Sequence, residues 1–191
     1  MNLAPYYFDE SKFTGYDARD GFFAQRALLE HYNGAAKLHM TWTAAGDSGA
    51  DKQRKLKFSE NWKNWRACLD AAETKLEKTA FHYLLRKPDD FLGFLYEIPE
   101  EILVSYFESY QAYLWNKTLK ELVKTVPPVE TMVSLKIPLL SAKTRMPDKT
   151  LEKIWREVLA AEKINTDMLF RTKFKKIRFL PGERAAVTSY C

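Results

Sequence analysis

Cysteine is scarce in this chain of 191 residues, which contains only Cys68 and Cys191. Two cysteines so far apart provide neither the paired spacing of a zinc site nor a disulfide framework. The scarcity argues against a small disulfide-stabilised secreted domain and predicts a protein of the reducing cytoplasm. The sequence predicts no metal site and no cofactor.

Long apolar runs are also absent. No window of 18 consecutive residues is wholly apolar, so we expect no segment to span a membrane, although hydrophobic residues make up 46% of the chain and suffice for a core. The first residues, MNLAPYYFDESKF, lack the basic and then apolar order of a secretory signal peptide.

Several common catalytic motifs are missing. The seven glycines form no phosphate-binding loop, and the chain has no His-Glu-x-x-His, no Cys-x-x-Cys and no nucleophile elbow. The three histidines, His31, His39 and His82, lie apart on expected helices. We interpret them as surface or interfacial residues and not as metal ligands.

The basic excess of the chain lies in one place. The formal net charge is +5, and the stretch from Arg171 to Arg184, RTKFKKIRFLPGER, carries that excess, because acids and bases balance elsewhere. Such a patch attracts a phosphate backbone, although an ordinary solvated strand explains the charge equally well. The candidate RNA-binding residues in it are Lys173, Lys175, Lys176, Arg178 and Arg184.

Apolar periodicity predicts a predominantly helical α+β protein with a few late β-strands. A first helix is expected at 17–32, and a second, short helix follows it and ends at about 45. Further helices are expected at 74–85, at about 99–126 and after Asp148. MVSLKIPLL is a candidate edge strand, and the tail KKIRFLPGERAAVTSY predicts two short strands around a Pro-Gly turn. The expected organisation is an irregular N-terminal segment with a helical hairpin (1–45), a flexible linker (46–56), and a helical domain with the long central helix and basic C-terminal strands (57–191).

Two segments do not fit a plain core pattern. In APYYFDESKFTG, residues 4–15, aromatic rings stand beside a lysine, so that Phe8 suits stacking on a nucleobase and Lys12 suits a phosphate. The alternative is an N-terminal arm that packs its rings on the body of the protein.

The second segment is ESYQAYLWNKTL, which sets Gln111 and Asn116 into an aromatic stripe of the long helix. Five positions separate the two amides, so on an ideal helix they point about 140° apart. They therefore cannot form one small site. We expect one of them to bind a neighbouring backbone and so to support the site structurally.

Together these residues resemble the TruD family of tRNA pseudouridine synthases. That family has an N-terminal motif of the form Pro-Asn-Tyr-Phe-Asp-x-Gln-Arg-Phe-Gly and, after a helical insertion, a helix with Ala-Tyr-Gln-Ser-Tyr-Leu-Trp-Asn. PYYFDESKF and SYQAYLWN occur here in the same order. Similarity to the family extends to three further stretches, WKNWRACL, LLRKPDDFLGFLYEIPEEI and KKIRFLPGERAAV. The resemblance thus covers nearly the whole chain and implies a helical insertion domain with part of the catalytic domain.

The resemblance implies tRNA modification by an isomerase that converts uridine to pseudouridine in RNA. The target uridine is flipped into a pocket, and an aspartate of the family acts at the ribose. By resemblance Phe8 receives the base. Lys12 stands where the family has arginine, and it offers a point charge without the bidentate fork.

Departures from the family pattern bear on catalysis. Tyr6, Ser11 and Thr14 replace the Asn, Gln and Gly of the N-terminal motif. The catalytic aspartate of the family lies upstream of that motif in a Gly-x-Lys-Asp context, which occurs nowhere in these 191 residues. Asp9 belongs to the loop and is not a substitute, so no catalytic residue is identified here.

The leading interpretation is therefore the central portion of a TruD-like enzyme, which binds RNA and does not catalyse by itself. Its expected partners are tRNA and the missing portion of the catalytic domain. The alternatives are a non-catalytic RNA-binding protein of the same fold and a helical protein-interaction module. The RNA target, the modified position and the oligomeric state do not follow from the sequence.

Overall fold

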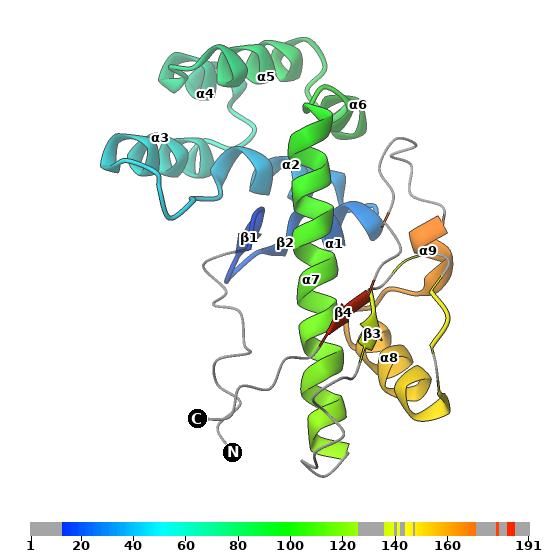
Figure 1. The fold of residues 1–191 in the computed structure, drawn as a ribbon. Coiled ribbons are helices and arrows are strands. Elements are labelled where there is room, and N and C mark those ends of the chain that lie inside the picture. Colours follow the sequence, from blue (N-terminus) through cyan, green and yellow to red (C-terminus); the bar gives the residue numbers. More distant parts are fainter. Residues whose placement is uncertain are drawn as a thin grey trace. The chain divides into compact units, whose positions relative to one another are not determined.

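The computed structural model describes residues 13–125, 136–139, 141, 144–146, 148–170, 179 and 183–185. The chain divides into two compact units, Glu10–Tyr106 and Met1–Asp9 with Phe107–Cys191. Helices dominate both units, and short strands accompany them (Figure 1), so the predicted α+β class is confirmed. The domain boundaries expected from the sequence remain a prediction. No helix among the described residues is long and apolar enough to cross a bilayer.

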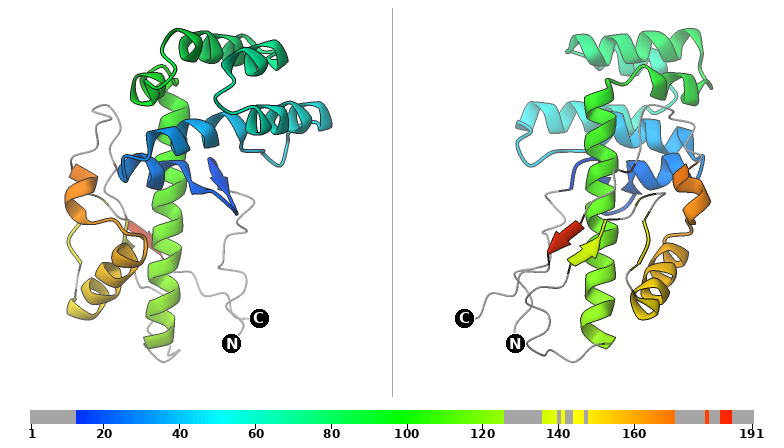
Figure 2. Two further views of the ribbon diagram at one scale, coloured as in Figure 1. Left: turned by 180° about the vertical axis from the view of Figure 1, so that it is seen from behind. Right: turned by 45° about the vertical axis from the view of Figure 1, so that its right-hand side comes forward.

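The unit Glu10–Tyr106 begins with an antiparallel hairpin, in which Tyr16 is opposite Phe22 and Asp17 is opposite Gly21. Helices follow the hairpin, and α4 and α5 pack side by side (Figures 1 and 2). The rings of Phe58 and Phe81 lie 4.8 Å apart, centroid to centroid, and are fully buried. The elements are β1 (Tyr16–Asp17), β2 (Gly21–Phe22), α1 (Phe23–Leu28), α2 (Tyr32–Thr41), α3 (Gly49–Glu60), α4 (Trp65–Ala71), α5 (Lys75–Arg86), α6 (Phe91–Tyr96) and the start of α7 (Glu100–Thr125).

The helix predicted over 17–32 is wrong at both ends. The Asp17 carboxylate accepts hydrogen bonds from the backbone N–H groups of Arg19 and Asp20, which closes the hairpin turn, and helix α1 begins only at Phe23. Gly34, a residue type that commonly ends helices, lies inside α2. A Cβ at Gly34 would overlap the guanidinium of Arg26, so this glycine permits close packing of α1 on α2 and ends no helix.

Helix α3 occupies most of the segment for which the sequence predicts a linker. Ser48 and Asp51 form a capping box, in which each side chain bonds the backbone N–H of the other. Arg54 then takes the place of an apolar core residue and is 7% exposed. Its guanidinium donates to Asp51 at 2.5 Å, to Glu73 at 3.0 Å and to Glu77 at 2.9 Å. These bonds join α3 to the turn before α5, so most of the supposed linker is ordered helix.

The other long helices match their predictions. Thr74 and Glu77 form the capping box of α5, and Asp148 accepts from the Leu151 N–H at the start of α8. Helix α7 runs over Glu100–Thr125, against the predicted range of about 99–126, and begins after Pro99 with two glutamates in its first turn. The boundary between the two units falls within α7, between Tyr106 and Phe107.

The unit that contains Phe107–Cys191 packs its elements around the second part of α7. Helix α8 lies beside this part of α7, inclined to its axis (Figures 1 and 2). Strands β3 and β4 pair antiparallel, with Ile137 opposite Arg184. The predicted edge strand is thus confirmed at residues 136–138, whereas the first strand of the predicted Pro-Gly hairpin lies outside the described residues. The elements are β3 (Lys136–Pro138), α8 (Lys149–Ala161), α9 (Thr166–Phe170) and β4 (Glu183–Ala185).

Candidate RNA-binding site

Most of the predicted RNA-binding residues fall outside the described part of the chain. Phe8 and Lys12 precede it, and Lys173, Lys175, Lys176 and Arg178 lie in the gap between α9 and Phe179. Arg184 is described through its backbone, in β4. The roles of all seven residues therefore stay predictions. The structure adds the contacts of Phe179 and of β4, which lie in the C-terminal part of the basic segment (residues 171–184).

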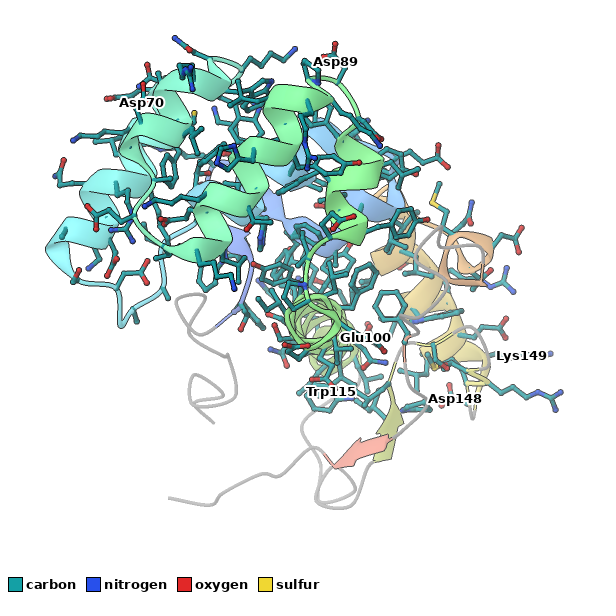
Figure 3. The ribbon with its side chains drawn as sticks, turned by 90° about the horizontal axis from the view of Figure 1, so that it is seen from above. Asp70, Asp89, Glu100, Trp115, Asp148 and Lys149 are labelled. Atoms are coloured by element: carbon teal, nitrogen blue, oxygen red, sulfur yellow. The ribbon has the colours of Figure 1, made fainter. Side chains whose placement is uncertain are left out.

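Strand pairing and a tryptophan fasten the C-terminal end of the basic segment to α7. The indole Nε1–H of Trp115 donates to the carbonyl of Ile137 at 3.1 Å, and Trp115 is 6% exposed. Figure 3 shows Trp115 on the side of α7 that carries β3. Because Ile137 pairs with Arg184, the Trp115 bond also holds the backbone of Arg184 beside α7.

A buried phenylalanine provides the second anchor. Phe179 is 5% exposed, and its ring lies 5.4 Å from that of Phe107, edge to face. It directly follows Arg178 in the sequence. Phe179 and β4 therefore both belong to the unit that contains the second part of α7.

A buried carboxylate locks α8 onto α7 in the same unit. Glu162 caps the C-terminus of α8 and is 6% exposed. The hydroxyls of Tyr110 and Tyr113 each donate to it at 3.2 Å, and the ammonium of Lys117 forms a short ion pair with it. An acid at a helix C-terminus opposes the helix dipole, so these three donors are what make its position favourable.

The pKa values of Tyr110, Tyr113 and Lys117 are all raised, so these groups keep their protons at neutral pH. Burial, reinforced by the Glu162 carboxylate, raises the pKa of Tyr110 far above its ordinary value, and burial raises the pKa of Tyr113 as well. Burial alone would lower the pKa of Lys117, but its interactions with Glu162 and Tyr113 together give a net increase. Both phenols therefore remain donors and the amine remains charged. The cluster is a structural support and shows no group prepared for proton transfer.

The single described cysteine is no nucleophile. Cys68 is fully buried, and burial raises the pKa of its thiol to about 11. The thiolate is the reactive form of cysteine, so Cys68 stays inert at neutral pH.

The two amides of the aromatic stripe differ. Gln111 is 5% exposed. Asn116 has a buried Oδ1 atom that accepts no hydrogen bond from the residues that the structure describes, and the same holds for Oγ of Ser109. Ser109 and Asn116 are seven positions apart, about two turns, and so share one side of α7. The supporting role expected of Gln111 or Asn116 stays a prediction.

Replacing Asn116 with alanine is expected to change the free energy of unfolding by less than about 1 kcal/mol, because no hydrogen bond is lost and a buried unpaired oxygen is removed. Thr118→Ala is the matched variant, since Thr118 is buried on the same helix and its hydroxyl donates to the Leu114 carbonyl at 2.9 Å. Urea unfolding measures both. A cost for Asn116→Ala equal to or above that for Thr118→Ala contradicts the expectation.

The sequence reasoning missed Glu162, Trp115 and the paired tyrosines as the residues that position the basic segment. One local signal was available. Glu162 is an acid placed at the end of a clean amphipathic helix, where the dipole disfavours it, and such a conflict indicates a partner elsewhere in the fold.

Comparisons with known proteins place this fold. The family model of tRNA pseudouridine synthase D (TruD) matches residues 4–135, which is more than half of the chain. A relative from Methanococcus maripaludis, named probable tRNA pseudouridine synthase D 1, is 28% identical over 134 residues, covering 68% of this chain and 34% of its own length. The tRNA pseudouridine synthase D of Aquifex aeolicus is 26% identical over 205 residues, covering 94% of this chain and 51% of that protein.

A solved structure gives the same answer for the fold. The crystal structure from Methanosarcina mazei, described as a TruD tRNA pseudouridine synthase, superposes with a TM-score of 0.73 at 13% identity. It covers 95% of this chain and 51% of that one. The helical α+β architecture with a long central helix is therefore that of a TruD-type protein. The chain belongs to the TruD family of tRNA pseudouridine synthases, and it spans about a third to a half of the length of the relatives described here.

Proposed function

We propose that this chain takes part in the conversion of uridine to pseudouridine in tRNA, and that its own contribution is to hold the RNA. The observation that carries the proposal is the match of the TruD family model over residues 4–135. The relatives from Methanococcus maripaludis and Aquifex aeolicus carry the names probable tRNA pseudouridine synthase D 1 and tRNA pseudouridine synthase D. The net charge of +5 gathered before and within β4 supports a phosphate-bearing partner.

The geometry of the second unit supports RNA holding by the basic segment. Its C-terminal part includes Phe179, whose ring packs on Phe107 of α7, and β4, which pairs with β3. Arg178 directly precedes the buried Phe179, and Arg184 lies within β4. Cations next to such anchors lose less conformational entropy on binding than those on a free tail. The basic segment is thus suited to bind an RNA backbone.

Catalysis is proposed to require more than these 191 residues. The isomerisation needs a carboxylate at the ribose of a flipped uridine, and the Gly-x-Lys-Asp context of the family does not occur in the sequence. The chain alone is therefore expected to bind tRNA without forming pseudouridine, and the partner in turnover is the remaining portion of the catalytic domain.

The test is binding of a tRNA transcript to the chain at several salt concentrations. We expect the dissociation constant to rise steeply with salt, because bound counterions are released from the RNA. Replacing Lys173, Lys175 and Lys176 together with alanine should weaken binding at least tenfold and make the slope of log K against log salt shallower by about three.

The matched control removes the same charge elsewhere. Lys52, Lys57 and Lys78 are exposed on α3 and α5, and their triple alanine variant should bind within about threefold of the wild type. Absence of binding, or binding that salt does not weaken, overturns the proposed RNA-holding role and favours a protein-interaction module. Pseudouridine formed on the transcript by the chain alone overturns the assignment of catalysis to other residues.

A further inference from the structure

A cleft of about 300 Å³ opens in the unit Glu10–Tyr106, away from every residue used in the proposal above. It is bounded by α2, α5, α6 and the turn before α7. Ligand pockets begin at about this volume, and they combine apolar walls with a few convergent polar groups. The cleft has both kinds of lining.

His39 is a polar residue of the cleft lining, and hydrogen bonds from neighbouring side chains indicate its tautomer. The indole Nε1–H of Trp42 can only donate, and it lies 3.1 Å from the hydroxyl of Tyr106. The Tyr106 hydroxyl also lies 2.9 Å from Nδ1 of His39. Because the hydroxyl hydrogen needs an acceptor and Trp42 offers none, we assign Tyr106 as the donor of this bond. His39 then carries its proton on Nε2.

His39 is neutral at physiological pH. Burial, assisted by the charge of Lys55, lowers the pKa of His39 to about 4. The neutral ring therefore lines the cleft with one N–H donor and no charge. Such a donor suits a carbonyl oxygen or a ring nitrogen of a ligand.

The two outer ends of the cleft are cationic. Lys75 and Arg86 both line it from α5 and are exposed. They lie eleven positions apart, so they share one side of the helix at a separation of about 16 Å along its axis. Neither forms an ion pair with any residue that the structure describes. Two unpaired cations at this separation match a chain of phosphates better than one small anion.

Aromatic rings form the wall between the cations. The ring of Tyr83 lies 6.3 Å from that of Phe94, and Phe94 is 2% exposed. The Tyr83 hydroxyl donates to Asp90 at 2.7 Å, and the Lys87 ammonium lies 5.3 Å from the centre of the Tyr83 ring. These contacts hold the ring in place. A rigid aromatic wall favours a flat ligand ring.

We propose that this cleft binds an unpaired nucleotide of the RNA, with its base on the Tyr83 ring that Phe94 backs, His39 donating to an acceptor on the base, and backbone phosphates on either side of that nucleotide at Lys75 and Arg86. The exposed carboxylate of Glu97, which also lines the cleft, accepts from an N–H of the base and disfavours a lone multivalent anion. The inference rests on the proposed function, because it assumes that the chain binds tRNA.

The first test removes the two cations. Lys75→Ala with Arg86→Ala should weaken binding of a tRNA transcript at least tenfold and reduce the salt slope by about two, as two lost phosphate contacts require. Lys57→Ala with Lys78→Ala is the control, since it removes the same charge from α3 and α5 at exposed positions outside the cleft. It should remain within about twofold of the wild type.

The second test blocks the cleft without changing charge. Thr79 is an exposed lining residue, and Thr79→Phe should weaken tRNA binding several-fold with an unchanged salt slope. Thr43→Phe makes the same substitution at an exposed position outside the cleft and should have no effect. Circular dichroism and thermal unfolding verify that both variants remain folded.

A competition experiment with a free nucleotide distinguishes a site for RNA from a site for a small molecule. Uridine 5′-monophosphate at millimolar concentration should not displace the transcript, because one phosphate cannot reach both cations. Displacement that Thr79→Phe abolishes would overturn the RNA assignment in favour of a small-molecule site. If wild type binds tRNA and both sets of cleft variants match their controls, this inference alone fails. If wild type does not bind tRNA, the proposed function fails first.

Discussion

Replacing Glu162 with alanine should lower the free energy of unfolding by about 3 kcal/mol, toward the lower end of the range for breaking a buried ion pair. The variant removes the bond from the fully buried Tyr110 side chain to Glu162 and removes the carboxylate that pairs with Lys117. The lower end of the range applies because the Lys117 side chain is 37% exposed and regains water. Urea unfolding, followed by tryptophan fluorescence, measures the change.

The control for this prediction lies on the same helix. Glu157 is exposed and lies 3.9 Å from Lys153, so Glu157→Ala should cost no more than about 0.5 kcal/mol. Glu162→Gln should fall between the two, because an amide oxygen still accepts from a tyrosine while the charge attraction to Lys117 is lost. Equal stability of Glu162→Ala and Glu157→Ala contradicts the view that this carboxylate holds α8 on α7.

Replacing Gly15 with valine should destabilise the protein by about 3 kcal/mol, the sum of a left-handed backbone strain and an overpacked contact. Gly15 has φ +66°, which side-chain-bearing residues rarely adopt. A Cβ there would overlap the ring of Tyr106, approaching its Cε1 atom to 2.8 Å. Tyr106 cannot move freely, because its hydroxyl is bonded to His39 and Trp42.

Gly46→Val provides the comparison for Gly15. No atom lies within 4 Å of a Cβ built at Gly46, and its φ is outside the strained region. We expect this variant to melt within about 2 °C of the wild type, since surface changes away from special features are nearly neutral. A melting temperature for Gly15→Val as high as that of Gly46→Val would show that the Tyr106 ring gives way without cost. A displaced Tyr106 ring would also perturb His39 at the wall of the cleft.

Local signals predicted the helices whose boundaries depend on near neighbours. Thr74 with Glu77 begins α5, Asp148 begins α8, and Pro99 with the acidic first turn begins α7. Apolar periodicity then placed the buried side of each helix. The same kind of signal was present but unread at Ser48 and Asp51, where small polar residues suggested a linker and instead cap α3.

Other features are invisible to local reasoning because their cause lies far away in the chain. Glycine commonly ends helices, yet Gly34 lies inside α2. Its missing side chain leaves room for the Arg26 side chain of the preceding helix. Arg54 reads as a surface residue, yet three carboxylates allow it to be buried, and two of them come from the turn before α5 and from its first turn. Neither outcome depends on helix propensity.

The candidate sites divide in the same way. Motif residues such as SYQAYLWN led to the TruD family, and the basic stretch before Arg184 was found by counting charge. The anchors of that stretch, Trp115 to Ile137 and Phe107 to Phe179, join residues that sequence spacing does not connect. The cleft at His39 needed Tyr106, 67 positions away, before its proton could be assigned.

The sequence by itself determined the helical class of this protein, its main helix starts and its family, because caps, periodicity and motifs act between residues a few positions apart. Only the tertiary structure decided where buried charges find partners, which glycines admit a neighbouring side chain, and which polar groups meet in a cleft. The physical reason is that a buried polar group is stable only beside its partner, and the folded chain supplies that partner from a distant position.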